Sequence, residues 1–354
     1  LGHYDHSQTL IIDPPLALNW ATYFGGVVGG GIDGAQSITV DGTGNVYICG
    51  YTGTNDFPTM NGGGYFDGTN NGGMADFIIK FNSAGVRQWA TYIEGTGSNG
   101  RSCIVTDASS NVYMTGIAHA QNNAIFPSLN PGGGAYYQPA SGGFFDSYIL
   151  KFNAASTLLW GTFFGGIGDE SGNSIDVDAA GNIFVTGNVS DTGFPTLNPG
   201  GTTYFDGVYG GNTASDIFIA KFSPASVLLW STYYGGSWGD AVIAADALDV
   251  SPAGDVYIVG YTENSNFPVF NPLGGAYYDG ANALLDQTGF ILRFSNTGQR
   301  LWATYFGGPD SDNNFSVTTD ALGNAWVVST TLSTAMPVAN PGGGAYYQGV
   351  SPSG

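Results

Sequence analysis

The nine residues LLWGTFFGG, from Leu158 to Gly166, belong to a motif that occurs five times in the chain. Each copy has a tryptophan, a threonine two residues later and an aromatic residue next, and most copies end in a double glycine. The other copies are LNWATYFGG at 18–26, RQWATYIEG at 87–95, LLWSTYYGG at 228–236 and RLWATYFGG at 300–308. Successive tryptophans are 69, 71, 70 and 72 residues apart. Fixed periods of this kind indicate a propeller or a solenoid.

Each period divides into four predicted strands. In the first complete unit these are SITVD (37–41), GNVYICGYT (44–52), DFIIKF (76–81) and the tryptophan strand itself. Four antiparallel strands per unit, joined in series, are typical of β-propeller blades rather than of a solenoid. Glycine, asparagine, threonine and aromatic residues dominate the composition, so we expect an all-β protein with almost no helix.

The number of blades follows from how the two ends of the sequence align. Four complete units lie within residues 37–306, and residues 313–330 add a first and a second strand. Residues 10–12 align with the third-strand residues 79–81, so residues 7–24 offer a third and a fourth strand. We therefore predict one domain, residues 1–354, with five blades, the last one closed by both ends. Open strand edges are a liability, which favours a complete ring, although six to eight blades are possible for a fragment.

The repeated tryptophans have a structural role in this arrangement. They lie on the outermost strand of each blade, where their side chains would fill the widening wedge between neighbouring blades. The double glycine then lets the backbone turn inward without obstruction from a side chain. The predicted structural residues are Trp20, Trp89, Trp160, Trp230 and Trp302.

The turn between the first two strands carries a recurrent aspartate. It occurs as Asp41-Gly-Thr-Gly-Asn45, and similar segments lie at 107–111, 178–182, 251–255 and 320–324. An aspartate that accepts turn amides, with glycine three residues later, makes a tight hairpin. Alternating Asp, Asn and Gly also suggests a calcium loop, but these segments are short and lack the bidentate glutamate of an EF-hand. We favour the turn.

Charge and composition limit the classes of partner that the chain is expected to bind. Seven Lys and Arg face 27 Asp and Glu, a net charge of −20, which argues against nucleic acid and anionic membranes as partners. No apolar run approaches the roughly 18 residues of a membrane span, so no membrane insertion is expected. Cys49 and Cys103 occupy positions that other copies fill with small residues, and we interpret them as buried rather than as a disulfide.

Catalytic and metal motifs are scarce. His3, Asp5 and His6 would need a fourth ligand and an ordered terminus to hold a metal, so no metal site is predicted there. There is no nucleophile elbow, phosphate loop or Cys-x-x-Cys pair. Asp169 and Glu170 could serve a glycosidase, but adjacent carboxylates rarely face each other across a scissile bond. We expect no enzyme and no cofactor, with calcium possible but not predicted.

Residues that break the repeat are better candidates for binding, because ring construction does not require them. Arg101 is the one basic residue without an equivalent in another copy, and Trp238 lies outside the tryptophan series. With the acidic loop residues they would form an acidic surface with aromatic edges, suited to a sugar or a cation. The candidate ligand-binding residues are Trp238, Asp240, Asp169, Glu170, Arg101, Asp310 and Asp312.

The motifs together resemble a known repeat family. TYFGG, SIDVDAAGNIFVTG, FPTLNPGG and Asp-x-Phe-Ile-Ala-Lys-Phe are similar to the SBBP repeats, described as seven-bladed β-propeller repeats of large secreted bacterial surface proteins. The resemblance covers essentially the whole chain and implies an extracellular or cell-surface location. It also implies export through the type IX pathway by a separate C-terminal signal, which these residues do not contain. It implies no catalytic residues.

Two functions remain open from the sequence. The first is a non-catalytic adhesion, binding or spacer module within a larger secreted polypeptide. Its partner would be an extracellular glycan or a protein surface, and its ligand face would be formed by the long loops after the second strands and the acidic loops between blades. The second is a glycan-cleaving propeller that uses loop carboxylates. A carboxylate pair in a deep central pocket would favour the enzyme, and a shallow aromatic surface would favour binding.

Overall fold

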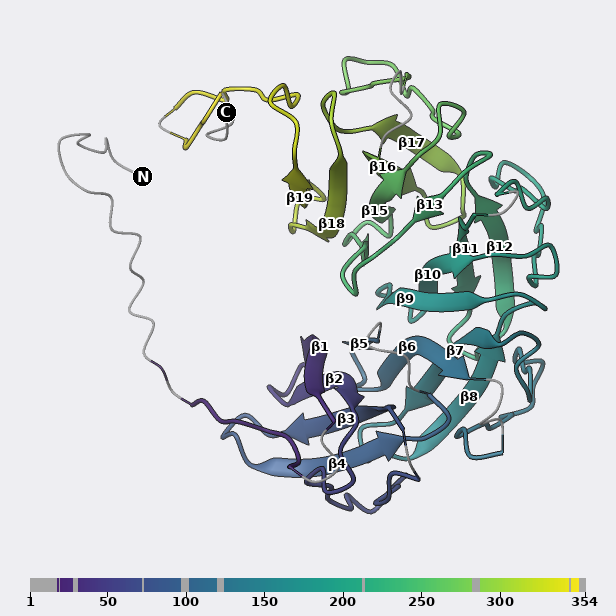
Figure 1. The fold of residues 1–354 in the computed structure, drawn as a ribbon, viewed down its shortest axis with the longest axis vertical. Helices are drawn as coiled ribbons and strands as arrows, with labels where there is room; N and C mark the ends of the chain where they lie inside the picture. Colours follow the sequence, from purple (N-terminus) through teal and green to yellow (C-terminus); the bar gives the residue numbers. More distant parts are fainter. Residues whose placement is uncertain are drawn as a thin grey trace.

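The computed structural model describes residues 18, 20–27, 31–71, 73–96, 102–119, 124–211, 214–281, 287–343 and 345–349. Within these residues the secondary structure is β-strand with no helix, so none of them forms a helix able to cross a bilayer. The strands form antiparallel sheets that are arranged around a common centre (Figure 1). The predicted all-β class and the antiparallel blades are confirmed.

Each sheet is one consecutive stretch of chain. The first blade contains β1 (Asp33–Val40), β2 (Val46–Thr52), β3 (Ala75–Phe81) and β4 (Arg87–Ile93), and the second contains β5 (Cys103–Thr106), β6 (Val112–His119), β7 (Phe145–Phe152) and β8 (Leu158–Phe164). The third contains β9 (Glu170–Val177), β10 (Ile183–Val189), β11 (Asp216–Phe222) and β12 (Leu228–Tyr234). The fourth contains β13 (Asp240–Ala241), β14 (Leu248–Val250), β15 (Val256–Thr262), β16 (Thr288–Phe294) and β17 (Arg300–Tyr305). In this blade β13 and β14 share the place of a single first strand.

A two-stranded sheet follows the fourth blade. It pairs β18 (Asp312–Thr319) with β19 (Ala325–Thr331), and no third strand joins it among the described residues. Residues 20–27 carry no strand, and residues 7–17 and 19, which the closing prediction also needs, lie outside the described part of the chain. The four-stranded blades thus agree with the sequence, while closure of the fifth blade stays a prediction.

Three tryptophans lie between blades as predicted. Trp89, Trp160 and Trp230 are almost completely buried. Their ring centroids lie 5.3, 5.4 and 5.7 Å from the rings of Phe152, Phe222 and Phe294, which end the third strand of the next blade. In each complete blade the register shifts just before this phenylalanine, a bulge that re-aims its side chain.

Lysines opposite these tryptophans make a second link between blades. Lys80 pairs across the strands with Trp89, and its Nζ donates to the carbonyl of Ala154 in the next blade at 2.9 Å. Lys151 and Lys221 make the same contact with Pro224 and Asn296 at 2.8 and 2.6 Å. Each link joins neighbouring blades through an outer turn.

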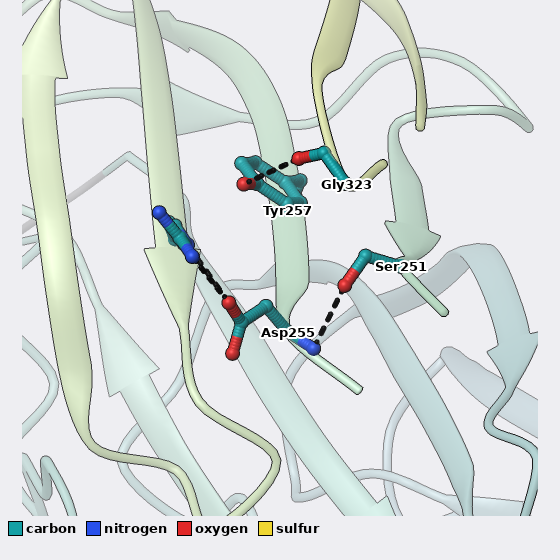
Figure 2. A network of polar contacts seen from close by, with 5 residues as sticks. Ser251, Asp255, Tyr257 and Gly323 are labelled. Atoms are coloured by element: carbon teal, nitrogen blue, oxygen red, sulfur yellow. Dashed lines mark hydrogen bonds and ion pairs between the residues drawn. The ribbon is translucent and has the colours of Figure 1, made fainter. Parts of the chain in front are cut away.

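Arg293, the equivalent residue in the fourth blade, has a different partner. It forms an ion pair of 2.5 Å with Asp255 in the turn of its own blade. Figure 2 shows this turn, in which the Ser251 hydroxyl accepts the amide of Asp255, and shows Tyr257 donating to the carbonyl of Gly323 in the β18–β19 turn. The fourth blade therefore contacts the two-stranded sheet without the lysine link.

The long loops between second and third strands cover the outer edge of each blade. Isolated bridges join them to the outermost strand, pairing Met60 with Ala90 and making the equivalent contacts Leu129–Gly161, Leu197–Ser231 and Phe270–Ala303. The Trp89 indole nitrogen donates to the carbonyl of Tyr65 in the same loop at 2.8 Å. This confirms that each loop folds back on its own blade. Some apolar residues of these loops, such as Phe57, are buried against the sheet, whereas others, such as Leu273 and Val208, are exposed, so the ligand face formed by these loops stays a prediction.

The turns and cysteines agree with their sequence interpretation. Asp41 Oδ1 accepts the amides of Thr43 and Asn45 at 2.9 and 3.0 Å, and Gly44 has a φ of 83°. Burial alone would raise the pKa of Asp41, but these hydrogen bonds outweigh it and hold the pKa well below its usual range. Cys49 and Cys103 are both buried and free.

Candidate functional site

Three of the described loops that connect successive blades have a buried carboxylate that accepts a loop amide. Glu170, Asp240 and Asp312 accept the amide of the second glycine of the preceding pair, at 2.7, 2.7 and 2.6 Å. At most 2% of each residue is exposed. These three residues were expected on an acidic surface, but they are buried because their carboxylates accept hydrogen bonds from loop amides. They hold the loops and lie beneath the surface.

The other candidates lie closer to solvent. Asp169 and Asp310 are exposed, and Asp169 Oδ1 accepts the amide of Phe145 at 3.1 Å. Arg101 lies outside the described residues.

Trp238 is the most distinctive residue of these loops. The residue is 61% exposed, whereas its backbone N–H and carbonyl are both held by one side chain. Asn264 Oδ1 accepts the amide of Trp238 at 2.6 Å, and Asn264 Nδ2 donates to the carbonyl of Trp238 at 2.9 Å. The fold thus presents a large aromatic side chain to solvent on a fixed backbone.

A second aromatic group was missed from the sequence. Phe144, 52% exposed, packs edge-on against His119 and Phe145 with centroid distances of 4.3 and 4.8 Å. A signal was present, since the first and third blades place Met-Ala and Ala-Ser where this blade has two phenylalanines. The hydrogen bond from the Phe145 amide connects this group to the loop of Asp169.

The cavity at the centre of the ring is formed by the innermost strands. A volume of about 290 Å³ is lined by residues of β1, β5, β9, β14 and β18 and by residues 245 and 246 just before β14. Side chains link these strands in turn: Ser37 Oγ donates to Cys103 Sγ, Cys103 Sγ to the carbonyl of Ile175, and Ser174 Oγ to the carbonyl of Ala245. The first strands of the four blades and of the two-stranded sheet therefore line one space.

Three carboxylates line this axial cavity: Asp176, Asp246 and Asp249. Asp176 accepts the amides of Val177 and Val250, both at 2.7 Å, and Asp249 accepts the hydroxyl of Thr319 at 2.5 Å. Burial raises the pKa of Asp176 to about 7. The lining contains no Lys, Arg or His, so the cavity is acidic. Asp176 and Asp249 act there as cross-links between strands of neighbouring blades.

The described residues contain no group of three or more His, Cys, Asp or Glu side chains placed to hold a metal ion. The terminal residues His3, Asp5 and His6, at which no metal site is predicted, lie outside them. The arrangement is suited to hydrogen bonding and aromatic stacking at the inter-blade loops.

Comparisons with known proteins support a repeat propeller. Residues 19–58 match the SBBP family, described as a beta-propeller repeat, which supports the family predicted from the motifs. An uncharacterized WD repeat-containing protein of Acanthamoeba polyphaga mimivirus is 24% identical over 284 residues, covering 70% of this chain and 20% of that protein. The chain thus spans about a fifth of that relative's length.

Two solved structures show weak similarity. A protein of unknown function from Dyadobacter fermentans is 11% identical, with a TM-score of 0.39 over 86% of this chain and 84% of its own. A puromycin hydrolase mutant is 9% identical, with a TM-score of 0.37 over 83% of this chain and 35% of its own.

Buried carboxylates make stability depend on pH. Burial raises the pKa of Asp76, Asp176 and Asp240 to about 7 each, above the value near 4 of an unfolded chain. The folded state therefore binds these protons more tightly, and the stability that this binding contributes is lost as the pH rises from about 4 through about 7. We expect a larger free energy of unfolding at pH 5 than at pH 8, measured by urea denaturation. Asp240→Asn should reduce this difference, and greater stability at pH 8 would contradict the burial of these groups.

Proposed function

We propose that the chain is a five-bladed, non-catalytic module of a secreted or cell-surface protein that binds an extracellular carbohydrate or protein surface. The observation that carries the proposal is Trp238, an exposed aromatic side chain on a loop that Asn264 fixes. A side chain that is already positioned loses little conformational freedom on binding. Tryptophan is also enriched among the residues that dominate binding energy at interfaces.

The net charge of the chain and the aromatic surface of Trp238 indicate the chemistry of the partner. The net charge of −20 repels polyanions, so a neutral glycan or a partner surface without strong negative charge fits best. Tryptophan offers an apolar face for a sugar ring or an apolar side chain, with a polar N–H at its edge. The extracellular location rests on the resemblance to repeats of secreted surface proteins. The same resemblance suggests export by the type IX pathway as part of a larger polypeptide.

The absence of catalysis is proposed from the state of the carboxylates. A glycosidase needs one carboxyl group as acid and a second as base or nucleophile, both facing the scissile bond. In the axial cavity Asp176 is held by two backbone amides and Asp249 by Thr319. Glu170 is buried beneath its loop, away from its exposed neighbour Asp169. These contacts favour structural roles over a catalytic pair.

The proposal also includes closure of the fifth blade by residues 7–24. Trp20 packs on Phe81 with ring centroids 5.0 Å apart, as Trp89 packs on Phe152 in the next pair of blades. Trp20 therefore occupies the place of a tryptophan from the blade that precedes the first. At the other edge, a cavity of about 420 Å³ lies beside Trp302 and the β18–β19 turn. A third strand supplied by residues 7–17 would fill it.

Binding should depend on Trp238. On a glycan array the wild-type chain should bind a neutral glycan, and Trp238→Ala should lower the affinity about tenfold or more, as loss of a central aromatic contact does. Thermal melting should change little, because the indole is mostly exposed. Leu273→Ala, at an apolar site on an outer loop that is even more exposed, serves as the control and should retain binding. A blank array would favour the spacer function, and cleaved glycan would overturn the absence of catalysis.

Ring closure predicts an energetic coupling between Trp302 and the N-terminal residues. Deletion of residues 1–13 should lower the melting temperature. Trp302→Ala should be costly in the full chain but nearly neutral after the deletion, because its contact is already lost. Trp230→Ala, whose partner Phe294 is in place, should cost the same in both backgrounds. An unchanged melting temperature after deletion, or additive effects at Trp302, would contradict closure.

A further inference from the structure

A hydrogen bond recurs at three of the points where an inter-blade loop meets the end of a second strand. The residue two positions after the second strand of a blade donates this hydrogen bond to the acidic residue near the start of the first strand of the same blade. Thr54 Oγ1 donates to Asp33, Asn264 Nδ2 to Asp240 and Ser333 Oγ to Asp312, at 3.2, 2.9 and 3.0 Å. The position therefore holds a hydrogen-bond donor in the first, fourth and last blades.

The third blade breaks this rule. The equivalent residue is Asp191, which as a carboxylate accepts and does not donate, and its acidic neighbour is Glu170. Asp191 Oδ2 accepts the amides of Ile167 and Gly168 at 2.5 and 2.6 Å, and Glu170 Oε2 accepts the amide of Gly166 at 2.7 Å. The remaining oxygens, Glu170 Oε1 and Asp191 Oδ1, are buried and have no hydrogen-bond partner. Two carboxylates meet where the other blades have a carboxylate and a donor.

A single unpartnered oxygen does not by itself distinguish this blade. One carboxylate oxygen of Asp240 and one of Asp312 are also buried without a partner. However, each of these residues receives its amide and also an N–H or O–H from Asn264 or Ser333. The Asp240 loop also has a second carboxylate with an unpartnered oxygen, Asp216. What distinguishes the third blade is that an aspartate stands at the donor position, so Glu170 receives a backbone amide where Asp240 and Asp312 also receive a side-chain donor.

The surroundings add negative charge and no cation. A Cβ placed on Gly165 would lie 2.3 Å from Glu170 Oε2 and 2.8 Å from Asp146 Oδ2, so a third carboxylate approaches the pair. Asp146 is itself held by four donors, from residues 138, 141, 142 and 143. Burial, then the charges of Asp191 and Asp146 and a hydrogen bond that protonated Glu170 can donate to Asp191, raise the pKa of Glu170 to about 9. The described residues contain no ion pair to any of the three carboxylates.

We propose that a divalent cation of the calcium class binds between Glu170 and Asp191. Glu170 and Asp191 interact electrostatically. A cation between two such buried carboxylates would stabilise both, and calcium prefers carboxylate and carbonyl oxygens. Glu170 Oε1 and Asp191 Oδ1 would be its protein carboxylate ligands, and backbone carbonyls and water would complete the shell. With two side-chain ligands the site belongs to the weak class, with a dissociation constant on the order of 10⁻⁴–10⁻³ M. The ion would fix the inter-blade loop that hydrogen bonds fix in the other blades.

Thermal melting tests the cation site with a substitution that restores a hydrogen-bond donor at position 191. In about 10 mM calcium chloride the melting temperature of the wild type should rise by roughly 2–4 °C over that in chelator. Asp191→Asn reproduces the Asn264–Asp240 pair of the fourth blade and should abolish this rise. Asp310→Asn removes the same charge from an exposed position of an equivalent loop and should retain the full rise. A wild type that does not respond to calcium, or a response that persists in Asp191→Asn, overturns the proposal.

Terbium luminescence reports occupancy directly. Tyr233 lies close enough to interact electrostatically with both Asp191 and Glu170, and Tyr209 does so with Asp191. Excitation of tyrosine should therefore sensitise bound terbium, and calcium should compete the signal away. The signal should be lost in Asp191→Asn and kept in Asp310→Asn. Stabilisation of the wild type by acid alone, with no calcium or terbium response, would show that a shared proton holds the pair and would overturn the cation site.

Discussion

The contact between the tryptophan of one blade and the phenylalanine of the next supports the whole architecture. A four-stranded sheet buries one face only when a neighbour covers it, so no blade can be stable alone. Trp160 and Phe222 show how the repeat solves this problem: the indole enters the wedge, and a bulge aims the phenylalanine at it. Lys151, which pairs with Trp160 across the strands, also donates to the carbonyl of Pro224 in a turn of the next blade. A single pattern of about 70 residues thus builds both a blade and its attachment.

This constraint also explains how the loops are distributed. The outer edge of a blade is a row of unpaired backbone groups, and the long loops cover it by pairing with the outermost strand, as Leu129 does with Gly161. The inter-blade loops must turn sharply, so a buried carboxylate gathers their amides. The exposed side chain of Trp238 is not used in building the blades, and our binding proposal rests on it.

Much of the fold could be predicted from the sequence because it depends on periodic, local signals. The tryptophan spacing, the Asp-to-Asn turns and the alternating strands were sufficient for the blades. The site was harder to predict, because an acidic loop residue has the same sequence signature whether it is solvated or buried. Asp240 lies inside because the amide of Gly236 faces it, and that depends on the three-dimensional turn. A usable signal was the repeated spacing of four residues between the second glycine and the acid in three copies.

The central claim is that neighbouring blades are held by the interlocked aromatic pair. A double-mutant cycle on Trp160→Ala and Phe222→Ala, measured by chemical denaturation, tests it most directly. Trp160→Ala alone should cost about 3–5 kcal/mol, as a buried large-to-small change does. The two substitutions should couple by about 0.5–1.5 kcal/mol, because each removes the partner of the other. Additive costs, to within about 0.3 kcal/mol, would show that the two rings act independently and would contradict the interlock.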